Sequence, residues 1–346
     1  QTAAAALAAT ILDSRTRASI DTSGVITSDS TVDLLASSAF DVDTFADGTP
    51  TDNATNNGFA VAANITRIVD EAFVQGTPTI TATALNVHTD GGSTLNVLSR
   101  SGAAGQDGPN PGVNAASVAL NTNIGGGAIQ GNLSHAYIGA NANITFVGNT
   151  DVDIAAANTT VTDASAEPEG AAVIAQDTGT GRSVATNISA YTTLASVDPG
   201  AVLTGAGDMS ITATGTQTSL ISALAGALAG VSASAQTVAA SVTANSSLVT
   251  IGSGASLALS GTFTARANHR ATNVVRARGD AAAAQDDTPT ESFALPMAVN
   301  LANDVATTSV AGTITAAGAV QITADADVEN ETEGVAGVHG ADAATT

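Results

Sequence analysis

The chain repeats with a period of about 57 residues, and this period constrains its fold more than any other feature. A four-residue motif occurs six times, in which a larger apolar residue is followed by Ala or another apolar residue, a spacer, and Asn, Thr or Ser. The copies begin at Leu7, Val61, Val118, Val184, Val238 and Met297. Their spacings are 54, 57, 66, 54 and 59 residues. Units of this kind bury their apolar faces by stacking on one another, so a single array is expected.

A second motif keeps the same period. It consists of two apolar residues separated by one residue, and its copies are 53, 67, 57, 54 and 57 residues apart. The pairs are Val32/Leu34, Leu85/Val87, Val152/Ile154, Met209/Ile211, Phe263/Ala265 and Val320/Ile322. One unit is stretched in both series, by an insertion near residues 125–127 or 91–92. We therefore expect one continuous repeat array over 1–346, with approximate units 1–58, 59–114, 115–170, 171–230, 231–291 and 292–346.

Short segments such as 79–81 and 210–212 alternate apolar residues with Thr or Ser, and Gly, Asn and Asp separate them. This alternation is typical of β-strands, so the chain is expected to be all-β and to form a parallel β-solenoid (β-helix) of about six repeats. If each repeat is one wide coil, six repeats rise by about 30 Å, because stacked strands lie about 4.8 Å apart. Three short coils per repeat would give about 85 Å. The sequence leaves both arrangements open.

Asparagine ends the first motif in four of its six copies, at Asn64, Asn121, Asn187 and Asn300. With one wide coil per repeat, these side chains would lie above one another and form a ladder of amide hydrogen bonds. The alternative is a polar residue at a bend of each coil. Both interpretations give the four residues a structural role.

Composition indicates a thin core and excludes some partners. Alanine contributes 73 of the 346 residues, so small side chains must fill much of the interior. The formal net charge is -22, and all nine basic residues are arginines, so a nucleic-acid partner is not expected. The absence of Cys removes disulfides and thiolate catalysis. Residues 219–242 are uncharged and long enough to cross a bilayer, but their Ala, Gly and Ser insert poorly, so we expect no membrane span.

The repeat resembles that of a known group of proteins. Val-Ala-x-Asn, as at 184–187, is followed by variants of Ala-x-Ile-Gly-x-Gly-Ala, as at 249–255, and of Gly-x-Val-x-Ile-x-Ala, as at 318–324. This order resembles the low-complexity repeats of giant bacterial surface adhesins of the filamentous-haemagglutinin and autotransporter type. The resemblance implies a secreted parallel β-solenoid stalk without cofactor or catalysis. The chain departs from it at Thr10 and Ser241, which replace Asn, and in having no lysine.

The acidic residues cluster once per repeat, and 17 of the 31 fall in stretches that also hold five of the eight prolines. Prolines mark loops, so stacking is expected to align these stretches into one acidic edge. Ca²⁺ binds carboxylate oxygens, and Asp41, Asp43 and Asp47, followed by Gly48, form the best single candidate for a calcium site. The spacing is not that of an EF-hand, and solvated loop charge is the alternative.

Catalytic motifs are weak. The four histidines fall in different repeats, and neither a Gly-x-Ser-x-Gly nor a His-Glu-x-x-His motif is present. A polysaccharide hydrolase built on Asp151 and Asp153 is conceivable, but aromatic residues for sugar stacking are few. Arg278-Gly279-Asp280 matches an integrin-binding tripeptide at the start of an acidic stretch, a match expected by chance. We expect no enzymatic activity and no cofactor other than the calcium ion considered above.

The expected function is that of a non-enzymatic extracellular structural or adhesive repeat protein, forming a stalk or fibre at the bacterial cell surface. Its expected partners are further repeats of a longer chain, other copies of itself, or a host-cell, neighbouring-cell or matrix surface. The sequence starts and stops within a repeat, which suggests a window of a longer array or a protomer that stacks end to end. The alternative is therefore a self-assembling extracellular filament whose subunits join through their terminal β edges.

Overall fold

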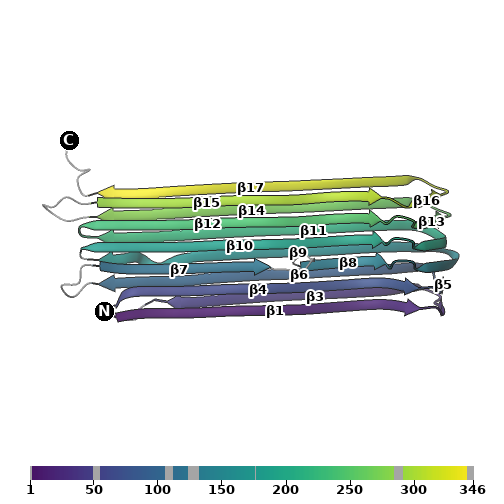
Figure 1. The fold of residues 1–346 in the computed structure, drawn as a ribbon, viewed down its shortest axis with the longest axis horizontal. Helices are drawn as coiled ribbons and strands as arrows, with labels where there is room; N and C mark the ends of the chain where they lie inside the picture. Colours follow the sequence, from purple (N-terminus) through teal and green to yellow (C-terminus); the bar gives the residue numbers. More distant parts are fainter. Residues whose placement is uncertain are drawn as a thin grey trace.

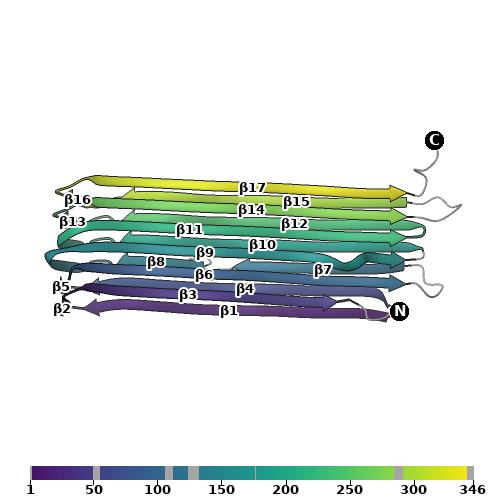
Figure 2. The same ribbon diagram turned by 180° about the vertical axis from the view of Figure 1, so that it is seen from behind.

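The computed structural model describes residues 2–49, 55–105, 112–123, 132–175, 177–283 and 291–340. These residues form parallel β-strands in two sheets that face one another, and they include no helix (Figures 1 and 2). The expected parallel β-solenoid is confirmed. No helix in the described part of the chain could cross a membrane, and residues 219–242 form the end of one strand and the start of the next.

Each coil contributes one long stretch of strand to each sheet. A turn joins the two, and a short strand follows the turn. The first sheet follows the order β1 (Thr2–Thr22), β4 (Thr55–Gly76), β7 (Gly112–Asn123) with β8 (Asn132–Ile138), β10 (Thr178–Val197), β12 (Ser232–Ile251) and β15 (Glu291–Val310). The second sheet contains β2 (Val25–Thr27), β3 (Thr31–Gly48), β5 (Thr79–Thr81), β6 (Ala84–Gly105), β9 (Asn143–Ala175), β11 (Val202–Ala229), β13 (Ser256–Leu259), β14 (Phe263–Ala283), β16 (Thr313–Ala316) and β17 (Val320–Gly340). In β9 and β11 the short segment after the turn is part of the long strand itself.

The strand register stacks both sequence motifs. In the first sheet Leu7 pairs with Val61, and the series continues in register to Met297. In the second sheet the series from Val32 to Val320 does the same. Each repeat is therefore one wide coil, and the three-coil alternative does not hold. Six coils rise by about 29 Å, whereas a 20-residue strand is about 66 Å long, so the molecule is a wide, flat slab.

The turn between the sheets has a sequence cause. In Asp198-Pro199-Gly200-Ala201 the Ala201 N–H donates to the Asp198 carbonyl at 3.3 Å, and Gly200 has a φ of 74°. Proline followed by a residue with positive φ is the signature of a type II turn. Asn141 and Gly254, at the equivalent position of the neighbouring coils, also have positive φ. In these three coils a local signal thus sets where the chain changes sheet.

The core is thin, as the alanine content predicts. Near the turns, large side chains such as Ile144, Leu203 and Phe263 fill the space between the sheets. Farther along the strands the buried apolar residues are mostly alanines. There the two backbones nearly touch, since a Cβ added to Gly181 would lie 2.2 Å from the Gly226 carbonyl oxygen. Small residues predominate there because the sheets leave little space between them.

The stretched unit is explained by an interruption of the first sheet. β7 ends at Asn123 and β8 begins at Asn132, yet both pair in parallel with β4 and β10 on either side. Most of the extra residues therefore lie at 124–131, outside the described residues, and the strand resumes in register after them. Gly91 and Gly92, the other place considered for the insertion, lie within the continuous strand β6.

Candidate functional site

A band of buried polar side chains crosses the interior between the apolar clusters. We call it the polar seam: the inward-facing polar residues of β4 at 64–70, of β12 at 241–247 and of β9 at 158–162, with their neighbours in register. It arises because the alternation that points side chains inward continues through polar positions. The inward residues of β12 illustrate the change from apolar to polar and back: Ala239, Ser241, Thr243, Asn245, Ser247 and Val249.

The four asparagines of the first motif lie at one edge of the polar seam, at one register position of the first sheet. Asn121 Nδ2 donates to Asn187 Oδ1 at 2.9 Å, a hydrogen bond between neighbouring coils. Asn187 Nδ2 also donates to Ser219 Oγ of the opposite sheet at 3.1 Å. The other two bond across the sheets: Asn64 with Thr44 and the Asn96 carbonyl, Asn300 with Asn330. The amides thus connect the sheets as well as the coils.

A buried acid–imidazole pair joins the two sheets within the polar seam. Asp304 Oδ1 of β15 lies 3.3 Å from His269 Nε2 of β14, and neither side chain is more than 2% exposed. His269 Nδ1 lies 3.3 Å from Ser247 Oγ. Asn245 Nδ2 donates to Asp304 Oδ1 at 2.6 Å, and Asn273 Nδ2 to Oδ2 at 3.4 Å. Burial raises the pKa of Asp304, but the hydrogen bonds, led by that from His269, outweigh burial and hold it below its usual value.

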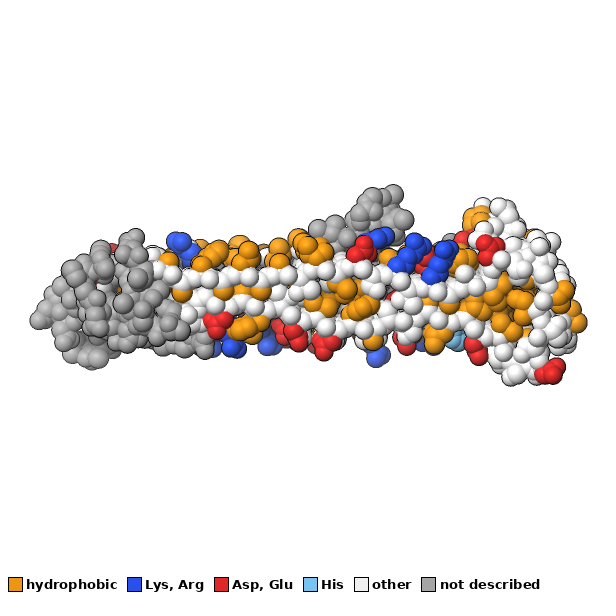
Figure 3. Space-filling view, turned by 90° about the horizontal axis from the view of Figure 1, so that it is seen from below, with side chains coloured by type: hydrophobic (Ala, Val, Ile, Leu, Met, Phe, Trp, Pro, Cys, Tyr) orange, Lys and Arg blue, Asp and Glu red, His pale blue; other side chains and the backbone are white. Residues whose placement is uncertain are grey.

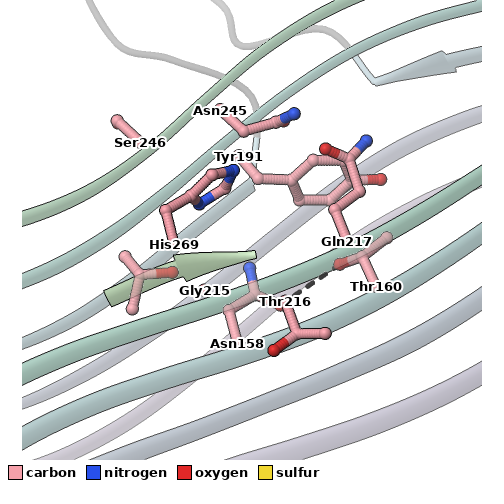
Figure 4. A pocket seen from close by; sticks show the side chains of 10 residues that line it. Asn158, Thr160, Tyr191, Gly215, Thr216, Gln217, Asn245, Ser246 and His269 are labelled. Carbon is pink, nitrogen blue, oxygen red and sulfur yellow. Dashed lines mark hydrogen bonds between the residues drawn. The ribbon is translucent and has the colours of Figure 1, made fainter. Parts of the chain in front are cut away.

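A small void adjoins this pair (Figure 4). Its volume is about 10 Å³, and its lining includes Tyr191, Gln217, Asn245 and His269. Gln217 Oε1 and Asn245 Oδ1 accept no hydrogen bond from the described residues. Burial raises the pKa of the Tyr191 hydroxyl to about 12. The void itself has room for one water molecule and for no larger substrate.

The calcium candidates do not converge on one point. Asp41, Asp43 and Asp47 all point outward from β3. A strand advances about 3.3 Å per residue, so Asp41 and Asp47 are about 20 Å apart, too far to bind one ion. Asp43 Oδ1 accepts from Asn96 Nδ2 at 2.7 Å, and Asp47 Oδ1 accepts from the Thr49 N–H at 2.9 Å. Within the described ranges, no group of three His, Cys, Asp or Glu residues is arranged to hold a metal ion.

The expectation that the acidic stretches form loops is wrong for many of the described residues. Asp163 lies in β9 and Asp280 in β14, and five acids follow one another on β17. The alternation of β17 places Asp325, Asp327, Glu329, Glu331 and Glu333 at outward positions, where they face solvent. Four others, Asp52, Asp107, Asp286 and Asp287, lie outside the described residues.

Arginines on β14 balance part of this charge. Four of the nine arginines lie on this strand, next to β17 in the second sheet. Arg276 pairs with Glu331 at 2.7 Å, and Arg270 with Asp327 at 3.5 Å. A surface hollow of about 500 Å³ lies over this region and is lined by Arg270, Asp327 and neighbouring polar residues. It is open to solvent, and Arg270 and Asp327 in its lining form an ion pair with one another.

An aromatic cluster lies on the outer side of the first sheet, and the sequence did not reveal it. The Arg17 guanidinium lies 4.5 Å from the centre of the Phe73 ring. Phe73 stacks on Tyr137 with ring centres 4.8 Å apart, and His135 on Tyr137 at 4.1 Å. Burial lowers the pKa of His135 to about 4, and the charge of Glu71 only partly opposes this. The insertion at 124–131 shifts Tyr137 and His135 against the sequence period, which hid their alignment with Phe73 and Glu71.

The weaker catalytic and binding candidates lie in ordinary strand positions. Asp153 pairs with His88 at 2.8 Å, and Asp151 Oδ1 accepts from the Asp208 N–H at 2.9 Å. Residues 278–280 lie inside β14, where the Arg278 guanidinium contacts the Asp280 carboxylate at 2.9 Å. The expectation that this tripeptide begins a loop is therefore wrong.

Comparison with known proteins adds no further constraint. No protein-family model, curated protein or solved structure matches the chain. The resemblance to bacterial surface adhesins therefore stays a prediction from the repeat motifs, and the functional argument rests on the chain's own geometry.

Proposed function

We propose that this chain is a non-enzymatic extracellular repeat protein with a structural or adhesive role, part of a stalk or fibre at the bacterial cell surface. The observation that carries the proposal is the continuous register of both sheets through all six coils, from β1 and β3 to β15 and β17. Such an array repeats its outward side chains about every 4.8 Å from coil to coil, which suits extended contact with a surface. The adhesin-like motifs of the sequence support the location.

The wide coil sets the mechanical character of this proposal. Each repeat of about 57 residues adds only about 4.8 Å of height. A spacer 100 Å tall would need about 21 such coils. The geometry therefore favours a broad ribbon that presents two large faces over a thin stalk that maximises reach. Binding to a host-cell, neighbouring-cell or matrix surface would use these faces.

Surface location is tested on intact cells of the source organism with an antibody raised against the chain. The proposal predicts labelling of unpermeabilised cells and loss of the label after external protease treatment. An intracellular protein probed in parallel controls for leakage. Labelling that appears only after permeabilisation, together with the intracellular control, would overturn the proposal.

A second candidate function, a filament subunit that stacks end to end, is favoured by the open edges of the outer coils. In the described structure, β1 and β3 have no strand partner on one side, and β15 and β17 have none on the other. Figure 3 looks onto the edge formed by β1 and β3 and shows apolar side chains of the interior between the sheets. Open edges of this kind bind further strands. The next coil can come from more of the same chain or from a second copy.

Charge would control such a junction. If the repeat register continued from β17 of one copy to β3 of the next, Glu329 would face Asp41, and Glu331 would face Asp43. Like charges directly opposite each other on adjacent strands are destabilising. Asp41 and Asp43, two of the calcium candidates from the sequence, could bind Ca²⁺ at this junction, because Ca²⁺ between facing carboxylates would remove the repulsion.

Sedimentation velocity and electron microscopy test this second function. Calcium is expected to produce end-to-end polymers, and EDTA to dissolve them. The double variant Asp41→Asn, Asp43→Asn is expected to polymerise without calcium, whereas Asp33→Asn, which would face the uncharged Gln321, should still need it. Absence of polymers in every condition would argue against the filament, and an equal effect of Asp33→Asn against the proposed register.

A further inference from the structure

The two outer faces of the slab differ in chemistry. On the first sheet, four adjacent rows of outward side chains run across all six coils, from the row of Ala5 and Leu295 to the row of Ile11 and Leu301. Arg182 is the one charged residue in these rows, and we call this area the apolar face. In Figure 3 orange side chains line the left half of the upper side, whereas blue and red ones lie farther right on that side and along the lower side.

The apolar face is exposed in the middle of the sheet as well as at its edges. Ile65 is 41% exposed, Ile188 48% and Val242 41%, and the register places all three in one row. Phe59 lies on β4, three rows from Ile65, and is 47% exposed. Large contiguous apolar patches are rare on soluble monomers and mark interaction sites.

The size of the apolar face fits a protein interface. Four rows of alternate residues extend about 26 Å along the strands, and six strands extend about 29 Å across them. The product is about 750 Å² per molecule, and two such faces would bury about 1,500 Å², the size of a standard stable interface.

The chemistry of the apolar face identifies its occupant. A partner with a charged surface would leave its charges unpaired there, because the face offers almost none in return. The partner must therefore present a flat, uncharged β-surface, and the same face of a second copy does so. Two sheets of this kind pack face to face about 10 Å apart with interdigitating side chains. We propose that two copies of this chain associate through their apolar faces about a two-fold axis, so that each buries the same residues.

This dimer is independent of the proposed end-to-end filament, because it uses a face of the slab and the filament uses its edges. Face-to-face pairing closes at two copies, whereas edge stacking continues without limit. The two modes can therefore be separated by the size of the assembly and by the residues on which it depends.

Analytical ultracentrifugation of the full chain, in EDTA to suppress any calcium-dependent stacking, tests the proposal. The chain is expected to form a concentration-dependent dimer. The double variant Ile188→Glu, Val242→Glu is expected to raise the dimer dissociation constant by at least about 100-fold, since each charge enters the interface twice. The double variant Ile188→Thr, Val242→Thr should weaken the dimer less than the Glu variant does. Because Thr has a high β-propensity, this variant shows the effect of lost apolar surface without disturbing the strands. Thr216→Glu, on the outer side of the second sheet, is the matched control and should leave dimerisation unchanged.

Three results would overturn the proposal. The first is a chain that stays monomeric at high concentration, and the second is an assembly that the control variant disrupts as strongly as the face variants. The third is a monomer that sediments with neutral phosphatidylcholine vesicles through Ile188 and Val242, which would assign the apolar face to a lipid surface. Circular dichroism of each variant verifies that loss of the dimer is not loss of the fold.

Discussion

The carboxylate of Asp304 and the imidazole of His269 meet between the two sheets, with Oδ1 and Nε2 3.3 Å apart and one residue contributed by each sheet. The pair lies at the end of the polar seam nearest the last coil, and Asn245 and Asn273 also donate to the carboxylate. The sequence gives little sign of this contact, because the two residues are 35 positions apart in strands of different sheets.

Replacing Asp304 by Asn should lower the free energy of unfolding at pH 7 by about 3 kcal/mol, because one accepting oxygen becomes an NH2 donor that faces buried donors. Since the pKa of Asp304 is depressed, its contribution is present above the unfolded pKa and is lost as the pH falls through the folded one. The difference between variant and wild type should therefore shrink in acid. Denaturant titration measures it, with the exposed Asp13→Asn as control. Equal losses in both variants would contradict a buried role.

For Asp70 we expect the opposite effect, that replacing the carboxylate stabilises the fold. Burial raises the pKa of this carboxyl, and hydrogen bonds from Ser38 and Thr16 only partly offset it. A raised pKa means that stability is lost as the pH rises from the unfolded pKa to the folded one, so ionised Asp70 destabilises the fold at pH 7. Asp70→Asn should therefore increase the free energy of unfolding by about 1 kcal/mol, measured at pH 7. A variant that melts earlier than wild type would show that the carboxylate is needed.

His135 predicts a pH dependence of its own. Its pKa falls from 6.5 to about 4 through burial beside Tyr137. The folded chain then binds fewer protons than the unfolded chain between these values, so stability decreases as the pH falls from 6.5 towards 4. The contribution of His135 to the slope should reach about 1.4 kcal/mol per pH unit, and His135→Gln should reduce the slope by that amount. Chemical-shift titration of the imidazole checks the cause, and a midpoint near 6.5 would contradict it.

The close approach of the sheets can be tested with glycines. A Cβ at Gly181 would lie 2.2 Å from the Gly226 carbonyl oxygen, so Gly181→Ala should cost about 2 kcal/mol through displacement of the backbone. Gly92 is the matched control, because its added Cβ would meet its nearest atom at 3.6 Å. Gly92→Ala should be neutral or slightly stabilising. Melting temperatures compare the two, and equal effects would mean that the sheets are farther apart than the structure shows.

The period and register were predictable from the sequence, and the coil width was not. Leu7 and Val61, or Val32 and Leu85, stack because each motif keeps a fixed place within its repeat. The same alternation fits one long strand or several short ones, so only the backbone shows how far each strand runs. Thr, Ser and Gly within β11 resemble turn residues, yet they continue the strand because their neighbours in β9 and β14 pair with them.

The candidate sites were predictable only in part. The asparagine positions follow from the period, and the structure places Asn121 and Asn187 in contact. The acids of β17 were expected in loops because charge and proline usually mark loops, but outward positions of a strand also accept charge. Tyr137 and His135 were hidden by the insertion before them. Contacts across the sheets depend on coil width, and the sequence does not specify it.

The central claim, one wide coil per repeat, is tested most directly by a disulfide between neighbouring coils. The chain has no Cys, so Val184→Cys with Val238→Cys introduces a single pair. These positions are register partners about 4.8 Å apart on the outer side of the first sheet, within the range that a disulfide spans. The account predicts oxidation to an intramolecular disulfide, and no bond in the out-of-register control Val184→Cys with Val242→Cys. Failure of the first pair to close would contradict it, since three short coils per repeat would hold the two residues about 14 Å apart.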